Sequence, residues 1–415
     1  MKRKLRIFSA WILVALFMQF GVYSFIDYQI NKVINPTAPP KLPPITTTLK
    51  ATIPSSNLEN IQISYAKDYL AYKENGIFKV FNLKKGKVVF EKKPMANSEK
   101  NMGVMGYQWL PDRDALIYFY SKKNPNPFTV ITVRPTKSVI TSKSEDNTSS
   151  DEKEVPQEPR TEKRYNNPWL TELYTLELPP SDEDIPPDDR PNDDISLASY
   201  PVGGIITQMA FSTFTNLMYV TVKSGTSMSL MEIDVMKHVR ILNRSGEWIT
   251  NMAVSDQQGT LYLDSKVGST KQVVAVKGWD RKVISKESKD LILGDRNGKL
   301  YLGEITNNQL TKIFTRADTP KFNEDVELIT VWEGSISYQD ARVVIGSLGQ
   351  IIIYSHQTAH IIDNGKSKQI SFNGEENYVS PDGAELIQLI REGTSTSIEL
   401  QPLEIENSLR THQKI

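Results

Sequence analysis

The sequence predicts an all-β protein of the seven-bladed β-propeller class, preceded by one membrane-spanning helix. A short unit recurs in which an apolar strand enters a tight polar turn and a second apolar strand leaves it. Its clear copies are VSPDGAELIQLI (379–390), YQWLPDRDALIYFY (107–120), MAFSTFTNLMYVTV (209–222) and MAVSDQQGTLYLDS (252–265). Looser copies lie at 63–74, 291–304 and 336–347.

The spacing of these copies indicates blades. The copies align on one position early in the second strand: Tyr72, Tyr118, Tyr219, Tyr262, Tyr301, Val344 and Gln388. Five of the six gaps span 39 to 46 residues, the length of one four-stranded blade. A β-sandwich with evenly spaced hairpins is the alternative, but hairpins alone would not repeat at blade length. We therefore expect seven blades.

Composition excludes several kinds of function. The chain has 415 residues, 39% of them hydrophobic, which is enough for a sizeable core. Its formal net charge is zero, so no global field favours nucleic acid. It has no cysteine, which excludes thiol nucleophiles, thiolate metal sites and disulfides. An extracellular eukaryotic propeller would more often carry disulfides, so the composition favours a bacterial protein.

The N-terminus predicts a membrane anchor. Residues 1–6 form a basic flank, and the uncharged residues 7–26 would span about 30 Å as a helix, the thickness of the bilayer core. The basic flank should stay in the cytoplasm and export the rest. A cleaved signal peptide is the alternative, but VYSFIDYQI offers no A-x-A-like cleavage site. We expect a single-pass protein of a bacterial plasma membrane with its C-terminal domain outside the cytoplasm.

A stalk and a closed ring should follow the anchor. Residues 27–45 end in a proline-rich run that favours polyproline II. The propeller should occupy 46–405, with a tail at 406–415. Its last blade shows only three strands, and Thr46–Ile53 is β-prone but belongs to no other blade. We expect that N-terminal strand to complete the last blade, because closure removes exposed sheet edges.

The second blade carries two insertions. Residues 136–164 are polar, charged and free of aromatic side chains, so we expect disorder. The strand 169–178 resumes the blade, and an acidic insertion at 179–194 precedes a strand at 195–202. The insertion holds seven carboxylates: Asp182, Glu183, Asp184, Asp188, Asp189, Asp193 and Asp194. It lacks the EF-hand pattern, so we expect a solvated loop, with weak calcium binding as the alternative.

No motif predicts a catalytic, cofactor or metal site. His356 and His360 are four apart, but apolar strands flank them, so they should lie on a hairpin rather than on one helix face. His238 and His412 stand alone. The tryptophans near strand ends should pack in the core, although some could line the central mouth: Trp109, Trp248, Trp279 and Trp332. No nucleophile elbow or phosphate loop occurs.

The turns SPDG (380–383), LPDRD (110–114) and VSDQQG (254–259) resemble the repeat of Tol-type periplasmic propellers. They are also similar to the N-terminal propeller of dipeptidyl peptidase IV-like proteins and, more distantly, to WD repeats. The resemblance covers about 57–405 and concerns fold alone. The peptidases carry their catalytic serine in a C-terminal hydrolase domain. About ten residues follow the last predicted strand, so we expect that catalytic domain to be absent.

Two functions fit this organisation. The first is a membrane-anchored envelope propeller that binds a protein or peptide and is not an enzyme, without cofactor or nucleic acid. The second is a propeller that binds or cleaves a glycan or cell-wall polymer, for which paired carboxylates are needed. Glu333 and Asp340 are candidates for such a pair. Acidic and aromatic side chains at the central mouth would favour the second function, and an apolar patch with a polar rim the first.

Overall fold

The computed structural model describes the propeller and little of what precedes it. The described residues are Gln19, Tyr23, 48–94, 103–133, 160–191, 200–201, 203–236, 238–322 and 324–403. Contacts divide the chain into Met1–Thr46 and Thr47–Ile415. The predicted flank, the stalk, the tail and all but two residues of the predicted anchor therefore lie outside the described residues. Within the described residues no helix has the length and apolar character needed to cross a bilayer.

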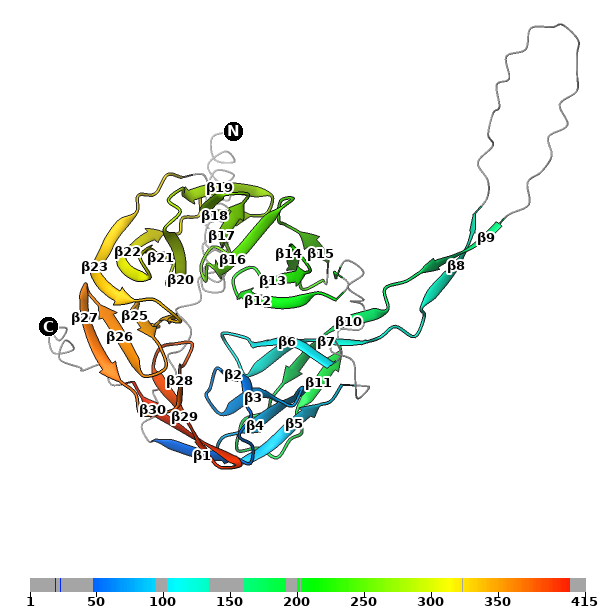
Figure 1. The fold of residues 1–415 in the computed structure, drawn as a ribbon, viewed down its shortest axis with the longest axis horizontal. Helices are drawn as coiled ribbons and strands as arrows, with labels where there is room; N and C mark the ends of the chain where they lie inside the picture. The colour runs from blue at the N-terminus through cyan, green and yellow to red at the C-terminus, as the bar shows by residue number, and fades with distance from the viewer. Residues whose placement is uncertain are drawn as a thin grey trace, which may run out of the picture. The chain divides into compact units, whose positions relative to one another are not determined.

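Seven four-stranded antiparallel sheets form a ring of blades (Figure 1). Blade 1 is β2 (Glu59–Ile63), β3 (Tyr69–Glu74), β4 (Ile77–Asn82) and β5 (Lys87–Lys92); blade 2 is β6 (Gly103–Trp109), β7 (Ala115–Lys123), β10 (Trp169–Glu177) and β11 (Asp188–Pro191). Blade 3 is β12 (Ile205–Ser212), β13 (Leu217–Ser224), β14 (Ser227–Ile233) and β15 (Val239–Ile241); blade 4 is β16 (Glu247–Val254), β17 (Leu261–Val267), β18 (Thr270–Lys277) and β19 (Asp280–Ser285).

Blades 5 to 7 complete the ring. Blade 5 is β20 (Asp290–Arg296), β21 (Lys299–Thr306), β22 (Gln309–Ala317) and β23 (Ile329–Ser337); blade 6 is β24 (Arg342–Ile345), β25 (Ile351–Tyr354), β26 (Thr358–Asp363) and β27 (Lys366–Ser371). Blade 7 is β28 (Glu376–Val379), β29 (Glu385–Glu392), β30 (Ser395–Pro402) and the N-terminal β1 (Leu49–Ile53). The seven-bladed all-β prediction is confirmed.

Blade 7 joins the two ends of the domain, as the sequence predicts. β1 pairs antiparallel with β30 from Leu49 opposite Leu400 to Ile53 opposite Thr396. Ile53 is 1% exposed, so this strand contributes to the core as well as to the ladder. The pairing gives blade 7 four strands, like the other blades, and covers the edge that β30 would otherwise expose.

The recurring unit has a common structure in four blades. Buried serines end the first strand or begin the turn that follows: Ser64, Ser212, Ser255 and Ser380. Their hydroxyl oxygens accept backbone N–H bonds from the turn or from the start of the next strand. The turn therefore satisfies its own backbone donors through the serine, as short Ser-containing turns do. The aligned tyrosines of the second strands are all buried, as core residues should be.

The sixth copy of the unit was assigned wrongly. Residues 336–347 span the end of β23, the outer strand of blade 5, and the whole of β24, the inner strand of blade 6. Val344 is therefore on an inner strand, whereas Tyr301 is on a second strand. The buried Ile336 ends β23 just before a tight turn, and this imitates the pattern of the repeat. The unit that belongs to blade 6 runs from β24 to β25.

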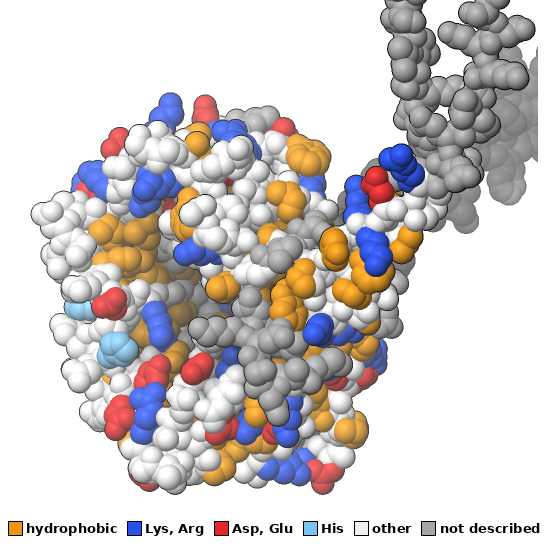
Figure 2. Space-filling view, turned by 45° about the vertical axis from the view of Figure 1, so that its right-hand side comes forward, with side chains coloured by type: hydrophobic (Ala, Val, Ile, Leu, Met, Phe, Trp, Pro, Cys, Tyr) orange, Lys and Arg blue, Asp and Glu red, His pale blue; other side chains and the backbone are white. Residues whose placement is uncertain are grey.

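The two ends of the first insertion in blade 2 pair with each other and form one hairpin. β8 (Phe128–Val133) pairs with β9 (Arg160–Tyr165), with Phe128 opposite Tyr165. Asn124 and Asn166 link this hairpin to the β7–β10 pair through backbone bonds to Pro168 and Pro127. The prediction of disorder is therefore wrong for 160–164, whereas 136–159 lie outside the described residues. Figure 2 shows hydrophobic and basic side chains together along this arm.

The acidic insertion is a solvated loop only in part: residues 182–186 are exposed, residues 188–191 form a strand of blade 2, and residues 192–194 lie outside the described residues. Asp188–Pro191 forms β11, the outer strand, paired with β10. Residues of blade 1 hydrogen-bond to the segment before β11. Tyr69 donates to the Pro179 carbonyl at 2.7 Å, and Asn82 donates to the Ser181 carbonyl at 3.2 Å. Lys85 pairs with Asp184 at 2.8 Å. The expected outer strand at 195–202 lies largely outside the described residues.

Asp189 is the best-held carboxylate of this segment. It accepts hydrogen bonds from the Lys92 ammonium at 2.8 Å and the Tyr118 hydroxyl at 2.6 Å. The Lys92 ammonium also lies 4.2 Å from the centre of the Tyr174 ring. Positive charge over an aromatic face and a paired carboxylate both stabilise a partly buried lysine. Two blades therefore share this polar contact, and the carboxylate is not free for calcium.

Candidate functional site

The candidate site is a cavity of about 830 Å³ in the described part of the ring. Its walls come mainly from inner strands, which contact one another in chain order: β2, β6, β12 and β16. Arg342 from β24 and Glu376 and Tyr378 from β28 complete the lining. The volume lies in the range of natural ligand pockets, about 300–1,000 Å³.

β-bulges orient the lining residues of the inner strands. The pairing of first and second strands shifts at Thr207 in blade 3, Thr250 in blade 4 and Leu293 in blade 5. Blades 1 and 2 have similar shifts before Gln62 and Gly106. A bulge adds a residue and re-aims the side chains that follow it. In each of these five blades, the residue directly after the shift faces the next blade.

That residue is either an amide or a glycine. Gln62 donates to the Tyr107 carbonyl at 3.0 Å, Gln208 to the Thr250 carbonyl at 2.8 Å and Asn251 to the Ile292 carbonyl at 2.7 Å. At Gly294 a Cβ atom would lie 2.9 Å from Ile345 of blade 6, too close for a larger residue. Successive inner strands are thus connected either by a hydrogen bond from a side-chain amide or by close approach at a glycine. These contacts shape the cavity wall.

The lining carries charges of both signs. Burial lowers the pKa of the Lys73 ammonium, and the nearby Glu59 carboxylate opposes that shift. Glu376 accepts a bond from Arg391 at 2.9 Å and a second from the Tyr378 hydroxyl. The Arg342 guanidinium lies 4.6 Å from the centre of the Tyr378 ring. The cavity therefore offers two mixed-charge groups on different blades.

Apolar and amide side chains separate these charged groups. Met105, Met209 and Met252 line the cavity and are half-buried. Methionine is unbranched and polarisable, so it adapts to ligands of irregular shape. The Oε1 atom of Gln208 is buried and has no hydrogen-bond partner among the described residues. That atom has almost no accessible surface, so a ligand N–H can bond to it only when the Gln208 amide turns toward the cavity.

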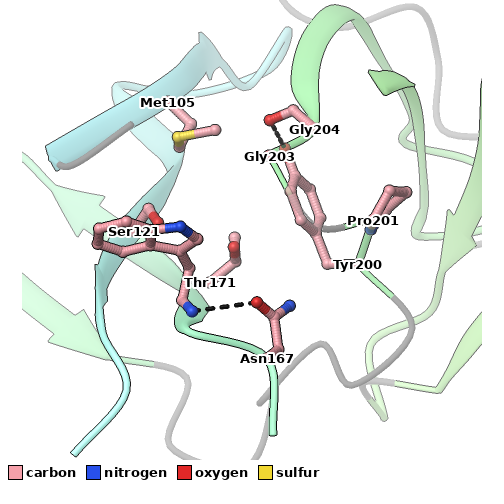
Figure 3. Close-up of a pocket in the computed structure, with 9 residues that line it drawn as sticks. Met105, Ser121, Asn167, Thr171, Tyr200, Pro201, Gly203 and Gly204 are labelled. Atoms are coloured by element: carbon pink, nitrogen blue, oxygen red, sulfur yellow. Dashed lines mark hydrogen bonds between the residues drawn. The ribbon is translucent and has the colours of Figure 1, made fainter. Parts of the chain in front are cut away.

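A second hollow between blades 2 and 3 is too small to bind a ligand. It has a volume of about 10 Å³ and lies among Met105, Trp169 and Tyr200 (Figure 3). The Tyr200 hydroxyl donates to the Gly204 carbonyl at 3.2 Å, and the Trp169 amide donates to Asn167 at 3.0 Å. This space holds at most one water molecule. It is a packing gap between blades.

The structure places the histidines and the proposed carboxylate pair away from this cavity. His356 follows β25 and His360 lies on β26, and neither lines the cavity. Glu333 is on the outer strand β23, and Asp340 is in the turn after it. Among the described residues no group of three or more histidine, aspartate or glutamate side chains could hold a metal ion.

Aromatic side chains offer the cavity little open surface. Trp109 and Trp332 are buried in core clusters, and Trp279 is 75% exposed but does not line the cavity. Tyr107 is 5% exposed, and its hydroxyl donates to the Asn60 carbonyl. Sugar rings bind to open aromatic faces, so this arrangement does not favour the glycan hypothesis. Sequence reasoning missed Glu59, Lys73 and Arg342, because no motif surrounds them.

Comparison with known proteins supports the fold alone. No protein-family model and no curated protein matches the chain. Among solved structures, the Dos1 propeller is similar at 12% identity, over 83% of this chain and 78% of that one, with a TM-score of 0.44. A prolyl endopeptidase is similar at 13% identity, over 85% of this chain and 48% of that one, with a TM-score of 0.42.

The acylaminoacyl peptidase of Pyrococcus horikoshii is similar at 11% identity, over 85% of this chain and 51% of that one, with a TM-score of 0.37. The chain thus spans about half the length of each peptidase. With identities this low and TM-scores below 0.5, these matches carry no conclusion about activity. The seven blades of the structure itself confirm the fold-level resemblance to propellers.

Proposed function

We propose that this protein is a membrane-anchored propeller outside the cytoplasm, and that its central cavity binds an extended peptide or protein segment. The composition of the cavity wall carries the binding part of the proposal. A polypeptide presents amide groups at every residue, with apolar and charged side chains between them. The wall matches this with side-chain amides, methionines and the two mixed-charge groups. The anchor and the location rest on the sequence of residues 1–26.

The proposed binding does not require catalysis. Glu376 is held by Arg391 and Tyr378, and the Glu59 carboxylate favours the charged form of Lys73. These contacts position charges that can orient a ligand, and they fit charge-assisted recognition of a peptide. Binding by a largely preformed pocket also loses little conformational entropy of the protein.

The test blocks the cavity. A phage library of random twelve-residue peptides is selected on the full chain, and the best peptide is measured by calorimetry. Gln108→Trp fills the cavity and should weaken binding at least about tenfold, or about 1.4 kcal/mol. Gln369→Trp, on the exposed outer strand β27, is the matched control and should bind like the wild type.

Two results would contradict the proposal. One is a selection that enriches no peptide. The other is a peptide that binds the two tryptophan variants equally well, because it would then bind outside the cavity. If purified cell-wall glycan fragments bind instead and Gln108→Trp blocks them, the glycan hypothesis replaces the peptide hypothesis at the same cavity.

A further inference from the structure

The hairpin of β8 and β9 has no role in the ring. It forms a two-stranded sheet of its own, and among the described residues β9 is the one strand that pairs with β8. One of its faces exposes three large hydrophobic side chains, Phe128 at 41%, Val130 at 55% and Tyr165 at 80%. An isolated two-stranded hairpin is only marginally stable in water, and three or more strands are needed for independent stability. No other described strand supplies the third strand that this hairpin would need.

The free edge of β8 differs from the outer edges of the blades. Each outer blade strand contains at least one charged residue, even the shortest, where Arg240 lies in β15 and Lys50 in β1. Charges on an edge strand are how proteins prevent unwanted strand pairing. β8 reads FTVITV and has none. Its β-branched and aromatic residues favour pairing, so this edge is not protected against another strand.

The other edge of the hairpin is protected. β9 reads RTEKRY and contains Arg160, Glu162, Lys163 and Arg164, all exposed. The Lys163 ammonium lies 4.8 Å from the centre of the Phe128 ring, so it also covers part of the apolar face. One hairpin thus has one edge that can pair and one that resists pairing. When the β8 edges of two hairpins pair, only the charged β9 edges remain outside, so no third hairpin can join the sheet.

We propose that the free edge of β8 pairs with β8 of a second copy of this chain and forms a four-stranded sheet, β9–β8–β8–β9. The difference between the uncharged β8 edge and the charged β9 edge indicates that the partner is a second copy of this chain. A two-fold pairing places both uncharged strands inside and both charged strands outside, so the assembly closes as a dimer. One six-residue strand on each side buries less than a standard interface of about 1,600 Å², so the association should be weak.

Cysteine cross-linking tests the pairing directly, because the chain has no cysteine of its own. In a symmetric antiparallel pair one central residue of the strand lies opposite itself, with its Cβ atoms about 4.5–5.5 Å apart. A disulfide spans up to about 4.5 Å between Cβ atoms, so a small local adjustment is enough to form one. Mild oxidation of the full chain in detergent should therefore give a covalent dimer from Val130→Cys or Ile131→Cys. Thr161→Cys on β9 should give none. A dimer from neither β8 variant, or an equal yield from the β9 variant, would overturn the proposal.

A charge placed on either edge gives a second test. Thr132 and Thr161 are opposite each other in the hairpin, and both are exposed. Thr132→Lys and Thr161→Lys therefore add the same charge to the same sheet, on the free edge and on the protected edge. Sedimentation equilibrium should show about a tenfold weaker dimer for Thr132→Lys and no change for Thr161→Lys. A wild type that stays monomeric at about 200 μM, or equal weakening by both variants, would contradict self-pairing.

Discussion

Buried carboxyl groups in blades 4 and 5 should make this protein less stable as the pH rises. Burial, with the charge of Asp256 second, raises the pKa of Asp295 to about 8. Burial also raises the pKa of Asp264 to about 7, against two weak bonds from the Ile292 amide. Both groups are then protonated in the folded protein at a pH where they are ionised in the unfolded chain.

The sign of the pH dependence follows from proton counting. Between an unfolded pKa near 4 and folded values of about 7 and 8, the folded state binds more protons, so stability falls as pH rises. Each group contributes at most about 1.4 kcal/mol per pH unit. Urea unfolding at pH 5, 6.5 and 8 should show a falling midpoint. Asp295→Asn should flatten the curve and exceed the wild type at pH 8, and parallel curves would refute this account.

A buried ion group joins blade 1 to blade 7. Lys67 is 3% exposed and pairs with Asp382 at 2.8 Å and with the fully buried Glu385. Burial alone would raise the pKa of Asp382, but bonds from Lys67 and Ser380 outweigh it, and the pKa is lowered. The seam between the first and last blades therefore depends on the Lys67 ammonium, which pairs with both carboxylates of the group.

Lys67→Met should test this seam. The substitution leaves Glu385 without its cation in a buried site, so unfolding should cost about 3–5 kcal/mol less than in the wild type. Lys50→Met is the matched control at the same joint, because the Lys50–Glu399 pair is exposed and should contribute less than about 1 kcal/mol. Equal urea midpoints for the two variants would show that the seam does not depend on this ion group.

At the level of elements, β1 is the strand on which closure depends. Removing residues 1–55 should lower the free energy of unfolding by at least about 3 kcal/mol, since the ladder to β30 and the packing of Ile53 are lost together. Removing residues 1–40 leaves β1 intact and should leave stability nearly unchanged. Urea unfolding of both forms is the measurement. Equal midpoints and slopes would show that β1 adds nothing to the ring.

Strands with an apolar buried run could be predicted from sequence, and two others could not. β13 and β17 each have five consecutive buried residues, including one tyrosine, and the sequence shows these runs directly. β9 has no buried face and β11 reads DDRP, so neither shows an apolar alternation. Lys92 and Tyr118 hold Asp189 of β11 in place, and they lie far away in the sequence.

The cavity was harder to predict than the blades. Whether a residue of an inner strand faces the cavity depends on the bulge before it, as at Thr207 and Thr250. A bulge shifts the alternation by one residue without a fixed sequence signal. Glu59, Lys73 and Arg342 also come from different blades, so only the closed ring brings them into one lining.

For the whole molecule, the decisive expectation concerns topology. The basic flank and the apolar run of residues 7–26 predict a C-terminal domain outside the cytoplasm. A reporter that works only in the cytoplasm should therefore be inactive when fused after Ile415. The same reporter fused after Arg6 should be active as a control. Activity at the C-terminal fusion, or a processed soluble form of the protein, would refute the anchor.

The pairing of β1 with β30 also sets the timing of biosynthesis. Thr396 donates a hydrogen bond to the Ser55 carbonyl, a residue 341 positions earlier in the chain. At about 5–20 residues per second, a ribosome needs roughly 20–70 seconds to make the chain between them. Through that interval β1 waits without its partner strand, and blade 7 stays unfinished. A chaperone that shields one β-strand near the exit site would therefore assist this protein more than one that acts after release.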